Sequence, residues 1–356
     1  MPIFCDLLKD NYKLSVLSER PRFPFRGVVI VADLTSDHIG TASHLRRDLE
    51  QTDRATLNEL SGAIERLGLK VYHYVSPKSL AANAARHLTD IVLSIFGGAV
   101  SRSRMALVPA VCESMGLSFI GPDAYGRIVC QDKEISKALA VEAGLRVPSH
   151  RIVRARDDLP KMSDLNLPYV IKPLWEGSSI GIGSDSLITD ARKGLKAVET
   201  LLVDFQQPVM VERFIAGREV SYCFINPVGH PPIRAVAEIV WQGEPDHFDH
   251  HLYDAVHKEA AIGEKRVKII SHELRMADAQ AIERLLQVLS PTGYGRVDGK
   301  LLNGQFVFLE VTPDAWLGST GTFVSSFADQ GLSFDEVIRW LLLSGRLAPR
   351  DQSTNG

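Results

Sequence analysis

Strand-like and helix-like patterns alternate over the first third of the chain. Strands are predicted at 27–33, 70–75 and 90–96, the first as a continuous apolar run. Apolar residues at helical spacing over 53–67 predict a helix after the first strand, and another helix is expected at about 103–115. Because strands alternate with helices, we expect a parallel sheet covered on both faces.

The pattern changes after Pro122. A helix rich in alanine and lysine is expected at about 132–143, ended by Gly144. Two further helices, at about 271–289 and 333–345, close the chain. Between the helix at 132–143 and the helix at 271–289 lie strand patterns with few helices. These patterns predict an antiparallel sheet from 169–173, 209–212, 218–225 and 235–241.

The segment 243–263 is polar, rich in histidine and without a period, so it is predicted to be a long loop. Its histidines suggest zinc, but no helical period places ligands and no cysteine cluster accompanies them. A mobile loop that closes over a substrate explains the composition better.

Composition excludes several classes of protein. The chain has 356 residues, 45% of them hydrophobic, and a net charge of −3, which gives no reason to expect nucleic-acid or membrane partners. No apolar run approaches the ~20 residues that span a bilayer. Four scattered cysteines without a C-x-x-C pair, and an N-terminus unlike a signal peptide, fit a reduced cytoplasmic protein.

The clearest chemical motif is a predicted hairpin around Asn303-Gly304. Arg296 and Asp298 point to the same face of its first strand, and Glu310 on the second strand can join them. Carboxylates beside an arginine suit Mg²⁺ that carries a phosphorylated ligand. A surface hairpin with ordinary salt bridges explains the same residues.

A loop of small residues at 176–183 follows Lys172, which ends a predicted strand. Such a loop lets backbone N–H groups converge on phosphate oxygens, although a plain hairpin turn has the same composition. Lys133 is either a second phosphate ligand or an exposed helical residue. The segment 212–219 is either a charged hairpin or a connector along which adenine lies, with Glu219 on the ribose.

Taken in order, these motifs resemble the D-alanine–D-alanine ligase family of the ATP-grasp superfamily, over about 27–343. Three stretches carry the resemblance: Tyr169-Val-Ile-Lys-Pro with Glu-Gly-Ser-Ser-Ile-Gly, Val211-Glu-Arg-Phe-Ile-Ala-Gly-Arg-Glu, and Gly295-Arg-Val-Asp with Phe-Leu-Glu-Val. They are similar to the family's phosphate loop, adenine connector and catalytic hairpin, respectively.

The resemblance implies an ATP-grasp fold of mixed α/β and α+β class. It would have an N-terminal Rossmann-like domain with a parallel sheet, a small central lid domain and a C-terminal domain with an antiparallel sheet. The expected divisions are an extension at 1–25, these three domains at 26–122, 123–210 and 211–347, and a disordered tail at 348–356.

The resemblance also implies the ligands of ATP and of one or two Mg²⁺ ions, for which Mn²⁺ can substitute. Asp298 and Glu310 would bind the metal, and Arg296 would stabilise the oxyanion of a tetrahedral intermediate. Ser178 and Lys258 would be further catalytic residues. The ATP-binding residues would be Lys133, Lys172, Glu176, Ser178, Ser179, Glu212, Phe214, Ile215, Glu219 and Lys258.

Several positions depart from the family pattern. Thr312 stands where the family has an asparagine metal ligand and is a weaker ligand, so Asp314 is considered as its substitute. Trp316 replaces a small glycine, and Gly321 replaces a serine that contacts the second D-alanine. The full set expected around the substrates is Asp37, His38, Arg102, Arg104, Glu259, Trp316, Ser319 and Gly321. The added arginines suggest a larger or more anionic acyl donor.

The expected function is therefore an ATP-dependent, ADP-forming carboxylate–amine ligase that works through an acyl phosphate on small molecules other than two D-alanines. The family resemblance makes a homodimer the expected assembly. An authentic D-alanine–D-alanine ligase is the first alternative. A non-catalytic ATP-binding sensor is the second; Thr312 favours it, and retention of Arg296 argues against it.

Overall fold

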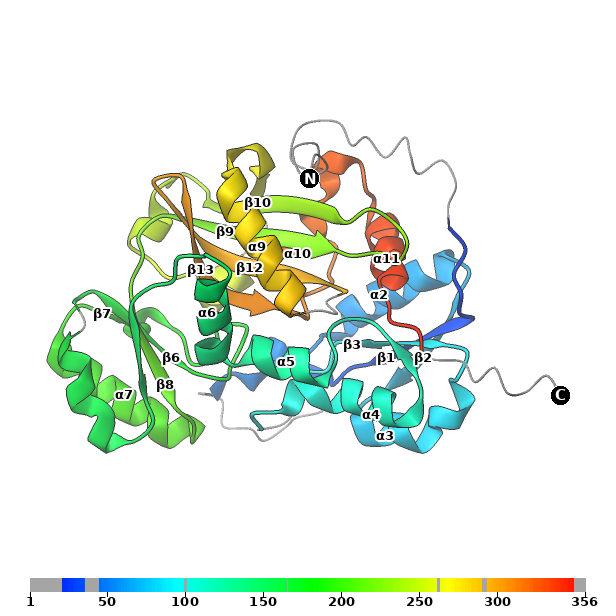
Figure 1. Ribbon diagram of the computed structural model, residues 1–356, viewed down its shortest axis with the longest axis horizontal. Helices are drawn as coiled ribbons and strands as arrows, with labels where there is room; N and C mark the ends of the chain where they lie inside the picture. The colour runs from blue at the N-terminus through cyan, green and yellow to red at the C-terminus, as the bar shows by residue number, and fades with distance from the viewer. Residues whose placement is uncertain are drawn as a thin grey trace.

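The computed structural model describes residues 21–35, 45–98, 101–164, 166–260, 263–289 and 293–348. Its elements form three sheets, each with its own helices (Figure 1). The expected mixed fold is confirmed: one sheet is parallel and the other two are antiparallel.

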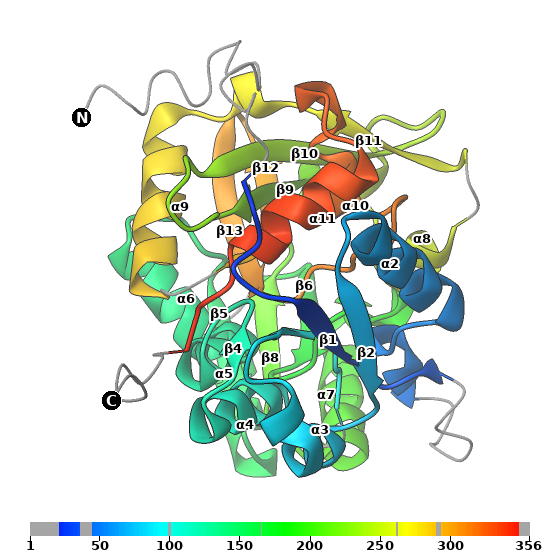
Figure 2. The same cartoon turned by 90° about the vertical axis from the view of Figure 1, so that its right-hand side faces the viewer.

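The first sheet has the order β2-β1-β3-β4 and is parallel throughout. Alternate residues of its central strand face opposite layers, as the period of a strand requires. Val28 and Ile30 pack toward α2 and α11, while Val29 and Val31 pack toward α3 and α4. Figure 2 shows α11 beside α2, far apart in the sequence. These elements span Gly27–Val31 (β1), Arg54–Arg66 (α2), Lys70–Tyr74 (β2), Pro77–Asn83 (α3), Ile91–Ser94 (β3), Leu107–Met115 (α4), Ser118–Phe119 (β4) and Phe334–Leu343 (α11).

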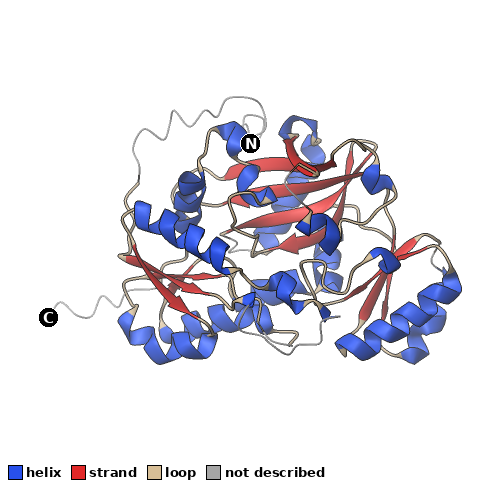
Figure 3. Ribbon diagram, turned by 180° about the vertical axis from the view of Figure 1, so that it is seen from behind, coloured by secondary structure: helices blue, strands red, loops and turns tan. Residues whose placement is uncertain are grey.

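The second sheet is small, antiparallel and ordered β5-β8-β6-β7. One helix, α7, covers it, and Figure 3 shows this unit standing apart at one end of the molecule. The prediction of few helices in this region is wrong at α7, which has 15 residues. The elements are His150–Val153 (β5), Tyr169–Pro173 (β6), Leu187–Ile188 (β7), Ala191–Phe205 (α7) and Val209–Arg213 (β8).

The third sheet is antiparallel, with the order β11-β10-β9-β12-β13. One face packs against α6 and α9, and the other packs toward α10 and α11. The helix α6 therefore lies on this sheet, although it precedes the small sheet in the chain. The elements are Lys133–Glu142 (α6), Arg218–Ile225 (β9), Ile233–Trp241 (β10), Lys265–Ile269 (β11), Met276–Val288 (α9), Tyr294–Leu302 (β12), Gln305–Thr312 (β13) and Thr322–Ser325 (α10).

Three further expectations need correction. The strands at 209–212 and 218–225 do not form one hairpin, because β8 and β9 belong to different sheets. The segment 243–263 is not a plain loop, since it contains η9 and α8. A helix at 124–131, α5, was not predicted, because Pro122-Asp123 was interpreted as a boundary although Asp123 caps that helix.

The remaining elements are short and join the three units. They are Arg47–Glu50 (η4), Ala84–Arg86 (η5), Arg104–Ala106 (η6), Ala124–Gln131 (α5), Arg156–Asp164 (η7), Ser184–Ser186 (η8), His247–Asp249 (η9), Ala255–Glu259 (α8), Ser271–Glu273 (η10) and Ala328–Gln330 (η11). Over the described ranges, none of the helices has the length and apolar character needed to cross a membrane.

Candidate functional site

Two adjoining cavities lie where the three sheets meet. The larger has a volume of about 980 Å³ and the smaller about 120 Å³. Five charged side chains line both: Lys133, Glu176, Lys258, Arg296 and Glu310. Residues from distant parts of the sequence thus meet in one continuous site.

The predicted hairpin forms the floor of this site. Asn303 and Gly304 have φ angles of 51° and 73°, the left-handed conformation that a two-residue hairpin turn requires. Asp298 lies directly opposite Glu310, and the register shifts between Asp298 and Gly299. Such a bulge locally disrupts the ladder and re-aims neighbouring side chains. The two carboxylates therefore meet as the sequence predicted.

Asp298 is held by hydroxyl groups on both sides. Ser221 Oγ donates to its Oδ1 at 2.6 Å, and Thr312 Oγ1 donates to its Oδ2 at 2.9 Å. The hydroxyl hydrogen of Thr312 is thus directed at a carboxylate. In this structure Thr312 positions Asp298; whether it also binds a metal stays a prediction.

Arg296 combines an ion pair with a free donor. Its Nη2 lies 3.2 Å from Asp298 Oδ2. Burial alone would lower the pKa of Arg296, but Asp298 and other neighbours raise it overall, so the guanidinium stays charged. Its Nε is buried and has no hydrogen-bond partner among the described residues. A buried, unpaired N–H is costly, and a developing oxyanion would satisfy it.

Glu310 is the centre of a cluster of cations. Burial raises the pKa of its carboxyl, but Lys133, Lys172, Lys258 and Arg296 together bring the pKa below its ordinary value. Lys133 Nζ lies 3.6 Å from Glu310 Oε2. Burial also lowers the pKa of Lys133 and of Lys258. Four cations thus surround the carboxylate of Glu310, so this part of the site suits an anionic ligand.

A buried triad of charges supports the back of the smaller cavity. Lys172 Nζ donates to Glu212 Oε1, and Lys137 Nζ lies 2.9 Å from Glu212 Oε2. Burial raises the pKa of Glu212, but the two lysines outweigh it and bring the pKa to about 2. Burial lowers the pKa of Lys137 to about 8.

Lys137 was missed by the sequence interpretation. It follows Lys133 by four residues, so both lie on one face of α6. That spacing was a usable signal, because a fully buried lysine needs a partner.

The small-residue loop after β6 has an unusual backbone. Ser178 and Ser179 both have positive φ angles, 49° and 64°. Non-glycine residues rarely adopt this conformation, and such strain concentrates at ligand sites. The loop is tied down at two points: Gly177 N–H donates to Glu50 Oε1 at 2.8 Å, and Ser179 Oγ donates to the carbonyl of Tyr253 at 3.2 Å.

The connector between β8 and β9 lines the smaller cavity through Phe214 and Ile215. Glu219, also on its wall, pairs with Lys300 Nζ at 2.7 Å. The smaller cavity thus brings together an apolar pair and a carboxylate, the residue types that the sequence assigned to a nucleoside.

The two arginines expected to meet a substrate have other partners. Arg104 is 2% exposed, and its Nη2 lies 2.7 Å from Glu50 and 3.0 Å from Glu176. Two carboxylates therefore offset its charge, which weakens the argument for an anionic acyl donor. Arg102 stacks on the ring of Trp175 at 5.0 Å.

Of the other expected substrate residues, some line the larger cavity and some lie outside the described residues. Asp37 and His38 lie outside the described residues. Glu259 lines the larger cavity but pairs with Arg46. Ser319 also lines that cavity, and its backbone N–H donates to Glu59 at 3.1 Å. The helix α10, which follows Gly321, has only four residues, so it offers no extended N-terminal dipole for a substrate carboxylate.

Trp316 and Gly321 form one structural unit on the wall of the larger cavity. The side chain of Trp316 lies against Gly318 and Gly321, and Trp316 remains 48% exposed. A Cβ added to Gly321 would lie 2.7 Å from Trp316 Cε3, closer than atoms can pack. The two departures from the family pattern are therefore sterically linked.

Asp314 has a partner that the sequence interpretation did not foresee. Its Oδ2 pairs with Nη1 of Arg127 on α5, and both side chains are largely buried. A guanidinium beside this carboxylate makes it a poor substitute for the missing asparagine.

We expect Asp314→Asn to leave the Mg²⁺ dependence of turnover unchanged and to lower the free energy of unfolding by about 3 kcal/mol. The loss arises because the variant leaves Arg127 as an uncompensated buried charge. A Mg²⁺ titration of activity measures the Mg²⁺ dependence, and urea denaturation measures the free energy of unfolding. A rise in the Mg²⁺ concentration for half-maximal activity would show that Asp314 binds the metal.

Comparisons with known proteins agree with this geometry. The family model described as D-ala D-ala ligase C-terminus matches residues 139–343. A D-alanine–D-alanine ligase of Syntrophobacter fumaroxidans is 27% identical over 268 residues, which cover 74% of this chain and 82% of that protein.

Two solved structures have the same fold. The D-alanine–D-alanine ligase of Bacillus anthracis complexed with ATP matches with a TM-score of 0.64 and 17% identity, over 90% of this chain and 97% of that one. The VanG D-Ala:D-Ser ligase of Enterococcus faecalis matches with a TM-score of 0.65 and 18% identity, over 90% and 99%. The fold is thus the ATP-grasp fold of these ligases, and, since the family model covers more than half of it, the chain belongs to the D-alanine–D-alanine ligase family.

Proposed function

We propose that this protein is an ATP-dependent, ADP-forming ligase that joins a carboxylate to an amine through an acyl phosphate. The observation that carries the proposal is the cluster of Lys133, Lys172, Lys258 and Arg296 around Glu310. A simple salt-bridged hairpin does not need four cations around one carboxylate. A nucleoside triphosphate and a developing oxyanion do.

In this proposal the smaller cavity holds the nucleoside. Phe214 and Ile215 contact the adenine, Glu212 bonds to it, and Glu219 bonds to the ribose. Lys133 and Lys172 bind the phosphates, and the loop with Glu176, Ser178 and Ser179 closes over the transferred group. The paired positive φ angles of Ser178 and Ser179 support this role.

The chemical steps take place in the larger cavity. A carboxylate oxygen attacks the γ-phosphorus, and ADP leaves. The amine then attacks the acyl carbon and loses a proton, and the C–O bond breaks to release phosphate. Arg296 donates its unpaired Nε–H to the oxyanion, while Lys258 offsets charge on the phosphoryl group. The cavity must exclude water, because water would hydrolyse the acyl phosphate.

The donor set fits Mg²⁺. Asp298 and Glu310 offer hard carboxylate oxygens in direct cross-strand register, and Glu310 remains ionised because of its neighbours. These two residues would hold the ion, with Thr312 supporting Asp298. The metal would neutralise charge on the phosphates during transfer.

The substrates are proposed to be other than two D-alanines. A cavity of about 980 Å³ is at the upper end of the range for small-molecule sites. Trp316 adds a large, half-exposed aromatic side chain to its wall. These features support at least one substrate larger than alanine. The names of the curated relatives favour the competing candidate, D-alanine–D-alanine ligation.

The contact between Trp316 and Gly321 gives a specific prediction. Gly321→Ser should lower kcat/KM for the best carboxylate–amine pair by about tenfold, because the added atoms displace Trp316. In a Trp316→Gly background the same substitution should cost less than about threefold. Such coupling is expected between residues in contact. Gly321 has a φ of −68°, so the serine itself causes no backbone strain.

The measurement is steady-state kinetics of the wild type, the two single variants and the double variant, with the KM for ATP as the internal control. Equal effects of Gly321→Ser in both backgrounds would show that Trp316 does not shape the substrate site.

Isotope transfer tests the proposed reaction. With both oxygens of the carboxylate substrate labelled with ¹⁸O, one label should appear in the released phosphate and one should remain in the amide. Unlabelled phosphate would contradict an acyl-phosphate route. Tight ATP binding without any product would favour the sensor alternative.

A further inference from the structure

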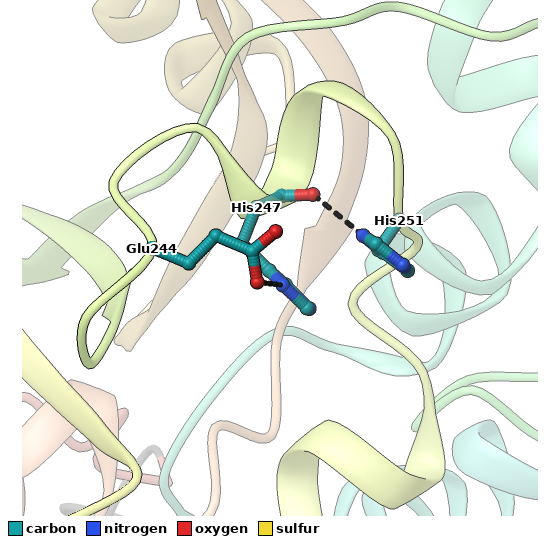
Figure 4. A group of neighbouring side chains, drawn as sticks. All are labelled: Glu244, His247 and His251. Carbon is teal, nitrogen blue, oxygen red and sulfur yellow. Dashed lines mark hydrogen bonds and ion pairs between the residues drawn. The ribbon is translucent and has the colours of Figure 1, made fainter.

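A second cluster of potential ligands lies in the segment 244–258, on η9 and α8. Figure 4 shows Glu244, His247 and His251, with one hydrogen bond between Glu244 and His247 and another between the His251 ring and the backbone carbonyl of His247. The Nδ1 of His247 lies 2.7 Å from Glu244 Oε2, and the Nδ1 of His257 lies 2.7 Å from Asp254 Oδ1. Their two Nε2 atoms lie 2.8 Å apart.

This arrangement conflicts with two neutral imidazoles. A carboxylate only accepts hydrogen bonds, so both Nδ1 atoms carry hydrogen. In a neutral ring the Nε2 then bears a lone pair, and here two lone pairs face each other. A cation must lie between them: either an extra proton or a metal ion. A carboxylate behind each imidazole is also the usual outer shell of a histidine that binds a metal.

His251 does not belong to the same ligand set. Its ring is stacked on that of His247, with centroids 4.2 Å apart and planes 8° apart. A metal lies in the plane of each imidazole that binds it, and two parallel planes share no such point. The rings of His247 and His257 make an angle of 61°, so their Nε2 lone pairs can converge.

Aromatic contacts hold the rings of His247 and His257 in place. The ring of Trp241 stacks on His247 at 4.9 Å and meets His257 edge-on at 5.0 Å. Lys265 Nζ is turned to the carbonyls of His257 and Lys258. Glu244 and Asp254 therefore leave the imidazole pair in a locally acidic setting.

We propose that His247 and His257 bind one divalent cation of the zinc class through their Nε2 atoms, with water completing the coordination. Zinc binds imidazole nitrogen at about 2.0–2.1 Å, so two nitrogens in a tetrahedral site lie about 3.3 Å apart. The pair must open by about half an ångström, a change within the reach of side-chain rotation. The helical segments η9 and α8 place these ligands, which answers the objection that no helical period does so; no cysteine is needed in a site of two histidines and water.

The two histidines lie next to a segment that lines the cavities. Neither histidine lines the cavities, but Lys258, which follows His257, lines both. A metal that joins η9 to α8 would fix the segment that carries Lys258 and that Ser179 contacts through Tyr253. Metal binding by the two histidines does not itself require the proposed ligase reaction.

Calorimetry of the full chain, freed of metal by chelator, tests the proposal. Zinc should bind at about one ion per chain, and cobalt should give the visible absorption of a tetrahedral site. His257→Gln and His247→Gln should each weaken zinc binding by at least tenfold. His250→Gln, an exposed neighbour, and His251→Gln should bind like the wild type.

Three outcomes would overturn the proposal. The first is no zinc binding by the wild-type protein, with nitrogen NMR showing a proton shared between the rings. The second is equal binding by wild type and by both variants of the pair, with circular dichroism confirming their fold. The third is loss of binding in His247→Gln and His251→Gln but not in His257→Gln, which would assign the ion to Glu244, His247 and His251.

Discussion

Replacing Lys172 with alanine is expected to lower ATP-dependent turnover by about 10²–10³-fold while the protein remains folded. Lys172 lies near the end of β6 on the wall of the smaller cavity, where we propose that it binds the phosphates of ATP. The fold should survive because Glu212 keeps Lys137 at 2.9 Å, so no buried carboxylate is left without a counter-charge.

Two measurements separate the phosphate role from a general defect. Binding of ATP should weaken in Lys172→Ala, whereas binding of adenosine, which lacks phosphate, should change little. Lys196→Ala, an exposed lysine on the helix of the same small sheet, should behave as wild type in both. Turnover at the wild-type rate in Lys172→Ala would contradict the assigned role, and equal loss of adenosine binding would indicate a collapsed cleft.

Glu310→Gln should lower turnover by about 1,000-fold, equivalent to about 4 kcal/mol of transition-state stabilisation. The substitution keeps the shape of the side chain but removes a metal ligand and the counter-charge of four cations. Binding of ATP in the absence of metal should be retained or strengthened, because the variant site is more positive. The increase in ATP affinity that Mg²⁺ produces in the wild type should be lost in this variant.

Calorimetry with ATP, with and without Mg²⁺, measures this difference. Glu113→Gln, an exposed acid on α4, is the matched control and should keep the metal-dependent gain. If Glu310→Gln still shows that gain, then Glu310 is not a metal ligand.

Local sequence patterns predicted the hairpin well. The turn Asn303-Gly304 specifies a two-residue hairpin, and the period of two along each strand places Arg296 and Asp298 on one face. The register that puts Asp298 opposite Glu310 includes a bulge, which the sequence alone does not reveal.

Long-range pairings were beyond the reach of sequence patterns. The contacts of Arg104 with Glu50 and Glu176, and of Arg127 with Asp314, join residues that only the packing of separate sheets brings together. Arg102 and Arg104 were therefore assigned to a substrate when one of them is neutralised by the protein.

Other errors had visible signals. The helix α7 begins after Asp190, whose side chain accepts from the N–H groups of Arg192 and Lys193 as an N-cap, and its apolar residues follow a helical period. The segment 243–263 gave a weaker sequence signal for helices, because η9 and α8 have only three and five residues and depend on tertiary contacts.

The most direct test of the central claim is the identity of the product. The protein is incubated with ATP, Mg²⁺ and an equimolar mixture of D-alanine with other carboxylates and amines, and new amides are identified by mass while ADP is counted. The account predicts one dominant amide, formed in equal amount to ADP, that is not D-alanyl-D-alanine. D-alanyl-D-alanine as the dominant product would contradict the proposed substrates, and the absence of any amide despite bound ATP would contradict the ligase itself.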